Sequence, residues 1–275
     1  MFTSFSARAG HPSRLSEDWA GASPTVAVVL DGLSTPTGHE TGCGHGTPWF
    51  VDQLGPCLLD HASSPQRTLA DSLARGRSPK WLRCTPSATW TAPRPRQPRW
   101  PRLASCLVPS AWSISSWLTQ PCSSAVPTSQ SQDAISDRRV DMFAQAEVEA
   151  ALRAPIGSDE HRDALTELVA AQRRLRNTPA GYWVAGADPR AAEQALTGTA
   201  ALADVTDLAL LTDGTSCIVT VFGELTDQQV LELLRHDGPE TLINQVRAIE
   251  LADPRGVRWP RFKTSDDATA LYLRW

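Results

Sequence analysis

The sequence predicts a mixed α+β fold, because short apolar strands and amphipathic helices follow one another on both sides of an unusual central segment. The chain has 275 residues, of which 41% are hydrophobic and 20% charged, which suits one large domain or two small ones. We expect a single domain over residues 1–275, built from residues 1–74 and 135–275. Residues 75–134 are expected to be poorly ordered, because no helical or strand-like period runs through them.

The N-terminal part contains one strand and two helices in this prediction. Residues 25–31 form an apolar run that is closed by Asp31-Gly32, which is typical of a buried strand followed by a turn. Residues 48–62 place apolar side chains at helical spacing, and residues 68–74 begin another amphipathic helix.

The C-terminal part alternates helices and strands. Ser158 has the character of a helix N-cap, with acidic residues in the following turn, and Pro179 marks the stop of that helix. A strand, two helices and a closing strand are then expected at residues 208–212, 226–236, 239–252 and 267–275.

Charge and hydropathy exclude several classes of function. A formal net charge of −4 argues against nucleic-acid binding driven by overall basicity. The longest apolar run, residues 26–30, is too short to span a membrane, and residues 1–10 lack the apolar core of a signal peptide. Six cysteines in a chain of this length do not form a disulfide framework. We therefore expect a cytoplasmic protein with no nucleic-acid and no membrane partner.

The central segment, residues 75–134, has a composition unlike the rest of the chain. It contains five of the ten tryptophans, nine of the 21 prolines, and eight basic residues against one acidic residue. A disordered linker would explain the prolines and arginines, but disordered segments are poor in aromatic residues.

A shifted reading frame explains this composition better. With GC-rich synonymous codons, the shifted frame of residues 79–101 encodes a helical pattern. The same shift over residues 111–125 encodes a buried strand that ends in Leu-Ala-Asp. We therefore interpret the segment as frameshifted from near Ala74 to just before Ile135. Loss of interior strands would leave the chain poorly folded or inactive.

Acidic residues stand beside the predicted strands and turns. Carboxylates at strand ends that are far apart in sequence are a common way to gather oxygen ligands around Mg²⁺ or Mn²⁺. Taken singly, an Asp-Gly pair is also an ordinary turn sequence. The four acidic pairs are Glu17-Asp18, Asp31-Gly32, Asp213-Gly214 and Asp266-Asp267.

In this order the four pairs resemble the motifs of the metal-dependent protein phosphatase 2C (PPM-type) family. The matching strings are S-E-D-W at 16–19, V-V-L-D-G at 28–32, L-L-T-D-G at 210–214 and S-D-D-A-T-A at 265–270. The string T-G-C-G-H-G at 41–46 is similar to one in a divergent actinobacterial branch. The resemblance implies a four-layer α-β-β-α sandwich of two antiparallel sheets, with the central strands missing or disordered in this chain.

The resemblance also implies an activity and a set of site residues. The activity is hydrolysis of a phosphomonoester, in a phosphoprotein or a small phosphoester, by a water that two Mg²⁺ or Mn²⁺ ions activate. Glu17 would act mostly through metal-bound water, and Arg14 is a candidate phosphate contact because a guanidinium can grip two phosphate oxygens. The implied metal ligands are Glu17, Asp31, Gly32 through its carbonyl, Asp213 and Asp266.

Two departures from the family pattern leave alternatives open. Many members have a histidine directly after the first Asp-Gly, where this chain has Leu33. His45 is the candidate catalytic acid in its place, although packing near the following helix is the simpler role. The family's middle motif has no match, so the alternative is a catalytically inactive phosphatase-like binding module. A zinc site is a third possibility, from His39, Cys43, His45, Cys57 and His61.

Overall fold

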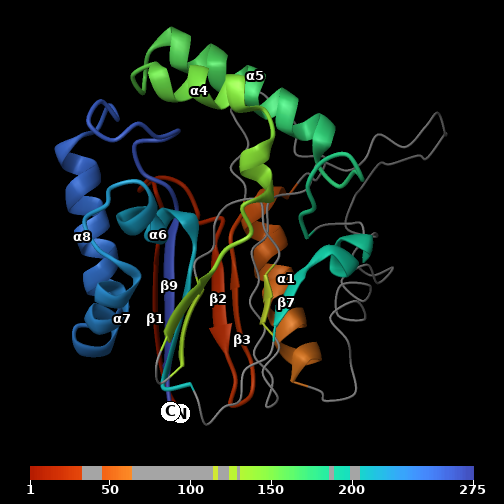
Figure 1. Cartoon of the computed structure of the whole chain (residues 1–275), viewed down its shortest axis with the longest axis vertical. Coiled ribbons are helices and arrows are strands. Elements are labelled where there is room, and N and C mark those ends of the chain that lie inside the picture. Colours follow the sequence, from red (N-terminus) through yellow and green to blue (C-terminus); the bar gives the residue numbers. More distant parts are fainter. Residues whose placement is uncertain (33–44, 64–113, 117–123, 129–130, 186–188, 199–204) are drawn as a thin grey trace.

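A computed structural model of the chain describes residues 1–32, 45–63, 114–116, 124–128, 131–185, 189–198 and 205–275 (Figure 1). Leu33 and the helix expected to begin at residues 68–74 lie outside the described residues. Within them, no helix is both long enough and apolar enough to cross a membrane.

The largest sheet joins strands from both ends of the chain. All of its neighbouring strands pair antiparallel, and the N-terminal strand is hydrogen-bonded along its length to the C-terminal one. The order across the sheet is β1 (Phe2–Arg8), β9 (Ala268–Arg274), β8 (Asp207–Leu211), β5 (Ser124–Thr128) and β6 (Ser131–Ile135).

Two smaller antiparallel pairs complete the strands. One is the hairpin of β2 (Trp19–Ala22) and β3 (Ala27–Leu30), and the other joins β4 (Ile114–Ser116) to β7 (Leu196–Gly198). Strand β3 is buried on both faces, as its continuous apolar sequence predicts.

The side chains of β3 alternate between two hydrophobic clusters. Val28 and Leu30 pack against Val51, Leu54 and Leu58 of α1 (Gly46–Ala62), which forms an outer helical layer. Ala27 and Val29 face the other way, into a cluster shared with β8 and β9, whose members are Leu208, Leu210, Leu271 and Leu273. This alternation with a period of two makes the hairpin an inner layer between α1 and the large sheet.

The opposite face of the large sheet is covered by three helices, α6 (Asp213–Thr220), α7 (Asp227–His236) and α8 (Pro239–Ala252). Leu211 on β8 and Tyr272 on β9 point into this helical cluster, one residue out of step with the side chains that face the hairpin. The layers are therefore helix, sheet, sheet and helices (Figure 1). The four-layer sandwich that the motif resemblance implied is confirmed.

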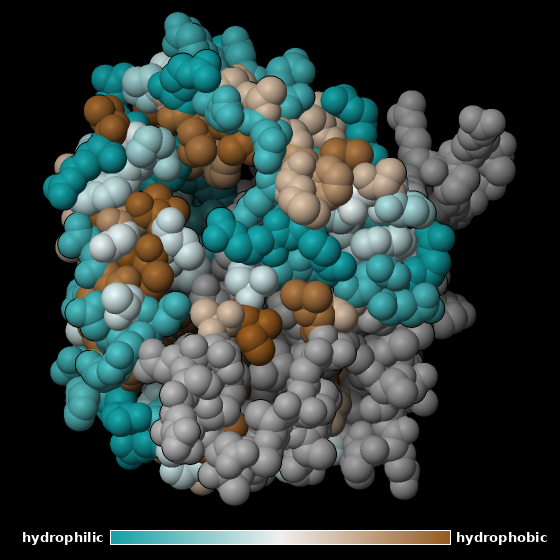
Figure 2. All heavy atoms as spheres, in the orientation of Figure 1, coloured by the Kyte–Doolittle hydropathy of each residue, from teal (hydrophilic) through white to brown (hydrophobic). Residues whose placement is uncertain are grey.

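The predicted helices and strands that fall within the described residues are present with small shifts at their ends. The side chain of Ser158 accepts a hydrogen bond from the backbone of His161 and caps α5 (Asp159–Leu175). Thr226 and Gln229 form a capping box at the start of α7. Helices α4 (Gln145–Arg153) and α5 lie side by side over one end of the sheets (Figure 1). Figure 2 shows a mostly hydrophilic surface on this pair and a hollow beneath it.

Most of residues 75–134 lies outside the described residues, so the expectation that this segment is poorly ordered stays a prediction. Strands β4 and β5 lie within it, and most of β6 does too. Strand pairing uses main-chain groups, so a segment without hydrophobic periodicity can still satisfy the open side of β8. Only Ser124 and Ala125 of β5 pair with β8, so Pro127, which lacks an N–H, lies beyond that pairing.

Truncation of the core between the sheets tests this layering. Leu210 is fully buried there, so Leu210→Ala should lower the free energy of unfolding by about 2–5 kcal/mol. Leu251→Ala is the matched control, because that side chain is 76% exposed on α8 and its loss should change stability by less than about 0.5 kcal/mol. Urea unfolding of both variants makes the measurement, and equal losses would contradict the layering.

Candidate metal centre

The four acidic pairs meet at one end of the sandwich because of how the strands pair. The end of β1 lies opposite the start of β9, with Arg8 opposite Ala268, and the end of β8 lies beside the same place, with Leu211 opposite Ala270. In the hairpin, the start of β2 lies opposite the end of β3. Every acidic pair either follows or precedes one of these strand ends.

Asp31 is the buried centre of this group. It is 8% exposed, and one of its carboxylate oxygens, Oδ2, lies 3.4 Å from the backbone N–H of Asp213, which donates to it. That N–H belongs to the first turn of α6, where the helix dipole favours a negative charge. Burial raises the pKa of Asp31 well above its usual value, and the charges of Asp213, Asp18 and Asp266 raise it further.

The glycine of each Asp-Gly pair allows another motif to approach closely. A Cβ atom on Gly32 would lie 2.1 Å from the carbonyl oxygen of Glu17. A Cβ atom on Gly214 would lie 2.0 Å from the carbonyl oxygen of Asp267. No side chain fits at either position, so glycine is needed there for the neighbouring motifs to approach this closely.

Asp267 joins three segments of the chain through both of its carboxylate oxygens. Oδ1 accepts a hydrogen bond of 2.7 Å from the backbone N–H of Gly10, and Oδ2 accepts one of 2.6 Å from that of Glu17. This carboxylate therefore fixes the loop after β1 and the start of β2. Arg14, the candidate phosphate contact, is exposed in that loop, where its backbone N–H donates to His11.

Asp18 lies buried beside the same group. Its Oδ2 accepts a hydrogen bond of 2.9 Å from the hydroxyl of Thr212, whereas its Oδ1 has no hydrogen-bond partner among the described residues. Burial raises the pKa of Asp18 well above its usual value, with a further contribution from the charge of Asp267. The hydroxyl of Thr269 offsets part of this shift, and a nearby cation would stabilise the buried carboxylate further.

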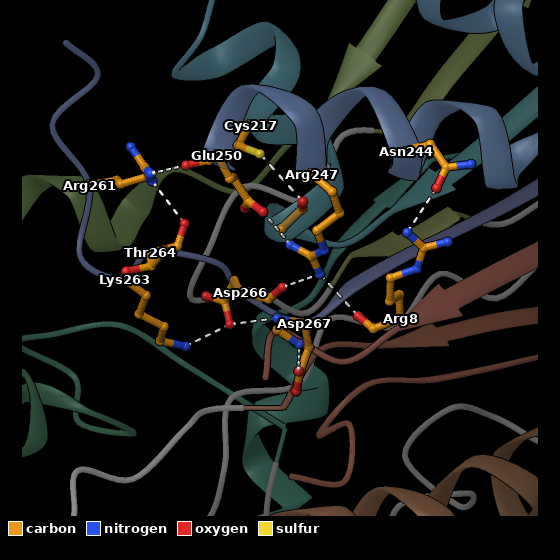
Figure 3. Close-up of polar contacts among 12 residues, drawn as sticks. Arg8, Cys217, Asn244, Arg247, Glu250, Arg261, Lys263, Thr264, Asp266 and Asp267 are labelled. Atoms are coloured by element: carbon orange, nitrogen blue, oxygen red, sulfur yellow. Dashed lines mark hydrogen bonds and ion pairs between the residues drawn. The ribbon is translucent and has the colours of Figure 1, made fainter. Parts of the chain in front are cut away.

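Asp266 is held by contacts to its carboxylate and to its backbone (Figure 3). Its Oδ1 accepts hydrogen bonds from the ammonium of Lys263, at 2.6 Å, and from the backbone N–H of Asp267, at 2.9 Å. Its carbonyl oxygen accepts a bond of 2.6 Å from Arg247 on α8. Arg247 is in turn paired with the buried Glu250, at 2.6 Å, so α8 sets where Asp266 lies.

Lys263 is a site residue that the sequence analysis did not identify. Partial burial lowers the pKa of its ammonium, but the charges of Asp266 and Asp213 outweigh this and raise the pKa above its usual value. Its charge also lowers the pKa of Asp31. A lone lysine three residues before an Asp-Asp pair is the only sequence signal for this contact.

His45 has a packing contact. Its ring stacks on that of Trp49, with centroids 4.4 Å apart, at the start of α1. The role of candidate acid stays a prediction. For the alternative zinc site, His39, Cys43 and the side chain of His61 lie outside the described residues.

The donors fit a divalent cation in their chemistry. Hard oxygen ligands from several carboxylates are what Mg²⁺ and Mn²⁺ take, and the raised pKa values and the unpaired Asp18 oxygen indicate a deficit of positive charge. As they stand, no three histidine, cysteine or acidic side chains of the described part of the chain are grouped closely enough to hold a metal ion. Lys263 supplies positive charge in this arrangement.

The fold matches solved phosphatases. No protein-family model and no curated protein sequence matches the chain. A crystal structure of a bacterial serine phosphatase is similar, with a TM-score of 0.53 and 14% identity over 100% of this chain and 97% of that one. A serine/threonine phosphatase from Staphylococcus aureus gives a TM-score of 0.53 and 14% identity over 99% and 94% of the two chains. The chain therefore shares its fold with these two bacterial phosphatases.

The raised pKa of Asp31 predicts how the stability of the metal-free protein depends on pH. The folded state keeps a proton that an unfolded Asp loses near pH 3.9, so its stabilising effect is complete below that pH. The effect is lost as pH rises through the folded-state pKa. In EDTA, wild-type protein should lose more stability than Asp31→Asn between about pH 5 and 7.5.

Urea unfolding of both proteins at the two pH values makes the comparison, and the difference between the two losses isolates the contribution of Asp31. Equal losses in the two proteins would contradict a raised pKa at this position.

Proposed function

We propose that this chain is a metal-dependent serine/threonine phosphatase that hydrolyses phosphomonoesters at the site around Asp31, Asp213 and Asp266. The observation that carries the proposal is the burial of Asp31 against the backbone of Asp213, with Asp266 close enough to raise the pKa of Asp31. The shared fold and the order of the four motifs support the same reaction.

Two Mg²⁺ or Mn²⁺ ions are the cofactors that this donor set suits. We propose that Asp31, Asp213 and Asp266 would hold these ions, with a contribution from Glu17. The Gly32 carbonyl is proposed as a further ligand because Gly32 directly follows Asp31, as the motif resemblance implies. When bound, such ions lower the pKa of a water molecule and neutralise charge on the phosphoryl group.

The remaining residues would bind and orient the substrate. Arg14 is exposed in a loop that Asp267 ties to the metal ligands, so its guanidinium is available to hold phosphate oxygens near them. His45 is the candidate proton donor to the leaving oxygen, with its ring oriented by Trp49. A phosphoprotein and a small phosphoester remain the two substrate classes, in a cytoplasmic protein without nucleic-acid or membrane partners.

The retained acidic residues favour an enzyme over an inactive binding module. A module without turnover has no need of several carboxylates whose burial is costly. We also propose that residues 1–275 form one domain, a proposal that the pairing of β1 with β9 supports.

Phosphatase assays test the proposed function. The wild-type chain should hydrolyse p-nitrophenyl phosphate in the presence of manganese and not in EDTA. Asp213→Asn should lower kcat/KM by at least about 100-fold, because it removes a ligand charge that the metal needs. Asp163→Asn is the matched control, since that side chain lies exposed on α5 and away from the site. Manganese-independent hydrolysis, or equal activity of the two variants, would contradict the proposal.

The frameshift interpretation of residues 75–134 predicts a different coding frame and a more stable chain once that frame is restored. Sequencing of the coding DNA across codons 74–135 should show a restored frame that encodes the helix and strand patterns described above. The restored chain should be more stable than the printed one, because interior strands bury more apolar surface. A coding sequence identical to the printed frame would rule this interpretation out.

A further inference from the structure

Lys263 places one positive charge among the acidic residues of the proposed metal centre. Its ammonium contacts Asp266 at 2.6 Å, and the side chain is 36% exposed, so the pair is only partly screened by water. The same charge interacts favourably with Asp31, Asp213 and Glu17. A single lysine therefore offsets part of the repulsion among the four carboxylates that are proposed to bind metal.

Hydrogen bonds hold the loop before Lys263 in place, and this positions the Lys263 ammonium beside Asp266. The carboxylate of Asp253, at the end of α8, accepts hydrogen bonds from the backbone N–H groups of Val257, Arg258 and Trp259, at 2.9–3.0 Å. A ring nitrogen of the buried His161, on α5, lies 3.1 Å from the carbonyl oxygen of Phe262. These contacts fix the backbone on the N-terminal side of Lys263, while Arg247 fixes the carbonyl of Asp266 on the other side.

We propose that Lys263 is a resident counter-ion of the metal centre, which holds Asp266 in the metal-free protein and with which a divalent cation competes for that carboxylate. This inference rests on the proposed function, because it assumes that Asp266 is a metal ligand. The lone pairs of the Asp266 Oδ1 atom already accept from Lys263 and from the backbone of Asp267. A cation that takes this oxygen as a ligand therefore competes with the ammonium directly.

Removal of the Lys263 charge should have opposite effects on the stability of the metal-free protein and on its affinity for a divalent cation. Without the ammonium, the carboxylates repel one another more strongly, so the metal-free protein is less stable. The same loss removes both a competitor and a like charge from the metal site, so a divalent cation binds more tightly. A lysine with a merely structural role would lower stability without raising metal affinity.

The experiment compares Lys263→Met with Lys263→Arg in the full chain. Lys263→Met should bind manganese at least about tenfold more tightly than wild type by calorimetry, and should melt at a lower temperature in EDTA. Lys263→Arg keeps the charge and should resemble wild type in both measurements. Arg153→Gln is the control for net charge, because that side chain lies exposed on α4, and it should leave manganese affinity unchanged.

The outcomes separate this inference from the proposed function. Manganese binding of equal or lower affinity in Lys263→Met, with binding intact in wild type, would overturn the counter-ion role and leave the metal site standing. No manganese binding to any of the proteins would overturn the proposed function and the competition together. An unchanged melting temperature of Lys263→Met in EDTA would also contradict the counter-ion role.

Discussion

Repulsion among carboxylates that cannot move apart is the constraint on which the site depends. Burial raises the pKa of both Asp31 and Asp18, and the charges of neighbouring acids raise it further. The strand ends that carry them are locked by the Asp267 carboxylate and by the close packing of Gly32 and Gly214. Since the backbone cannot relax, the negative charge is reduced by protonation, which the raised pKa values favour, or is met by a cation. In the metal-free protein Lys263 meets part of it, and we propose that divalent ions meet the rest.

A buried carboxylate that is not proposed to bind metal lies at the other end of the same sheet and provides a comparison. Asp207, at the start of β8, is fully buried and accepts hydrogen bonds from Tyr272 and Arg235. Burial raises the pKa of Asp207, but these hydrogen bonds outweigh it and lower the pKa below its usual value. A carboxylate of this kind is satisfied within the protein. Asp31 receives one long backbone hydrogen bond from Asp213, which is the difference expected between a structural acid and a ligand.

Much of the fold was predictable because its signals are local. The apolar run before Asp31 and the cap at Ser158 each depend on neighbouring residues, and both are present. Helix α6, which begins at Asp213, was not predicted. The roles of Asp267 and Lys263 were not predictable in the same way, because their partners, Gly10 and Asp266 among them, become visible only when the loops are placed. Strand β5 was missed for another reason, since its pairing depends on main-chain groups and leaves no pattern in its side chains.

The most direct test of the metal centre is a crystal structure of the chain grown with manganese, with anomalous scattering measured at the manganese edge. Metal ions bound by carboxylate oxygens lie within about 2.5 Å of them. Manganese peaks are predicted at that distance from Asp31, Asp213 and Asp266, with the ammonium of Lys263 moved away from Asp266. A structure without anomalous peaks among these residues, in which Lys263 still contacts Asp266 at full manganese concentration, would contradict the existence of the metal site.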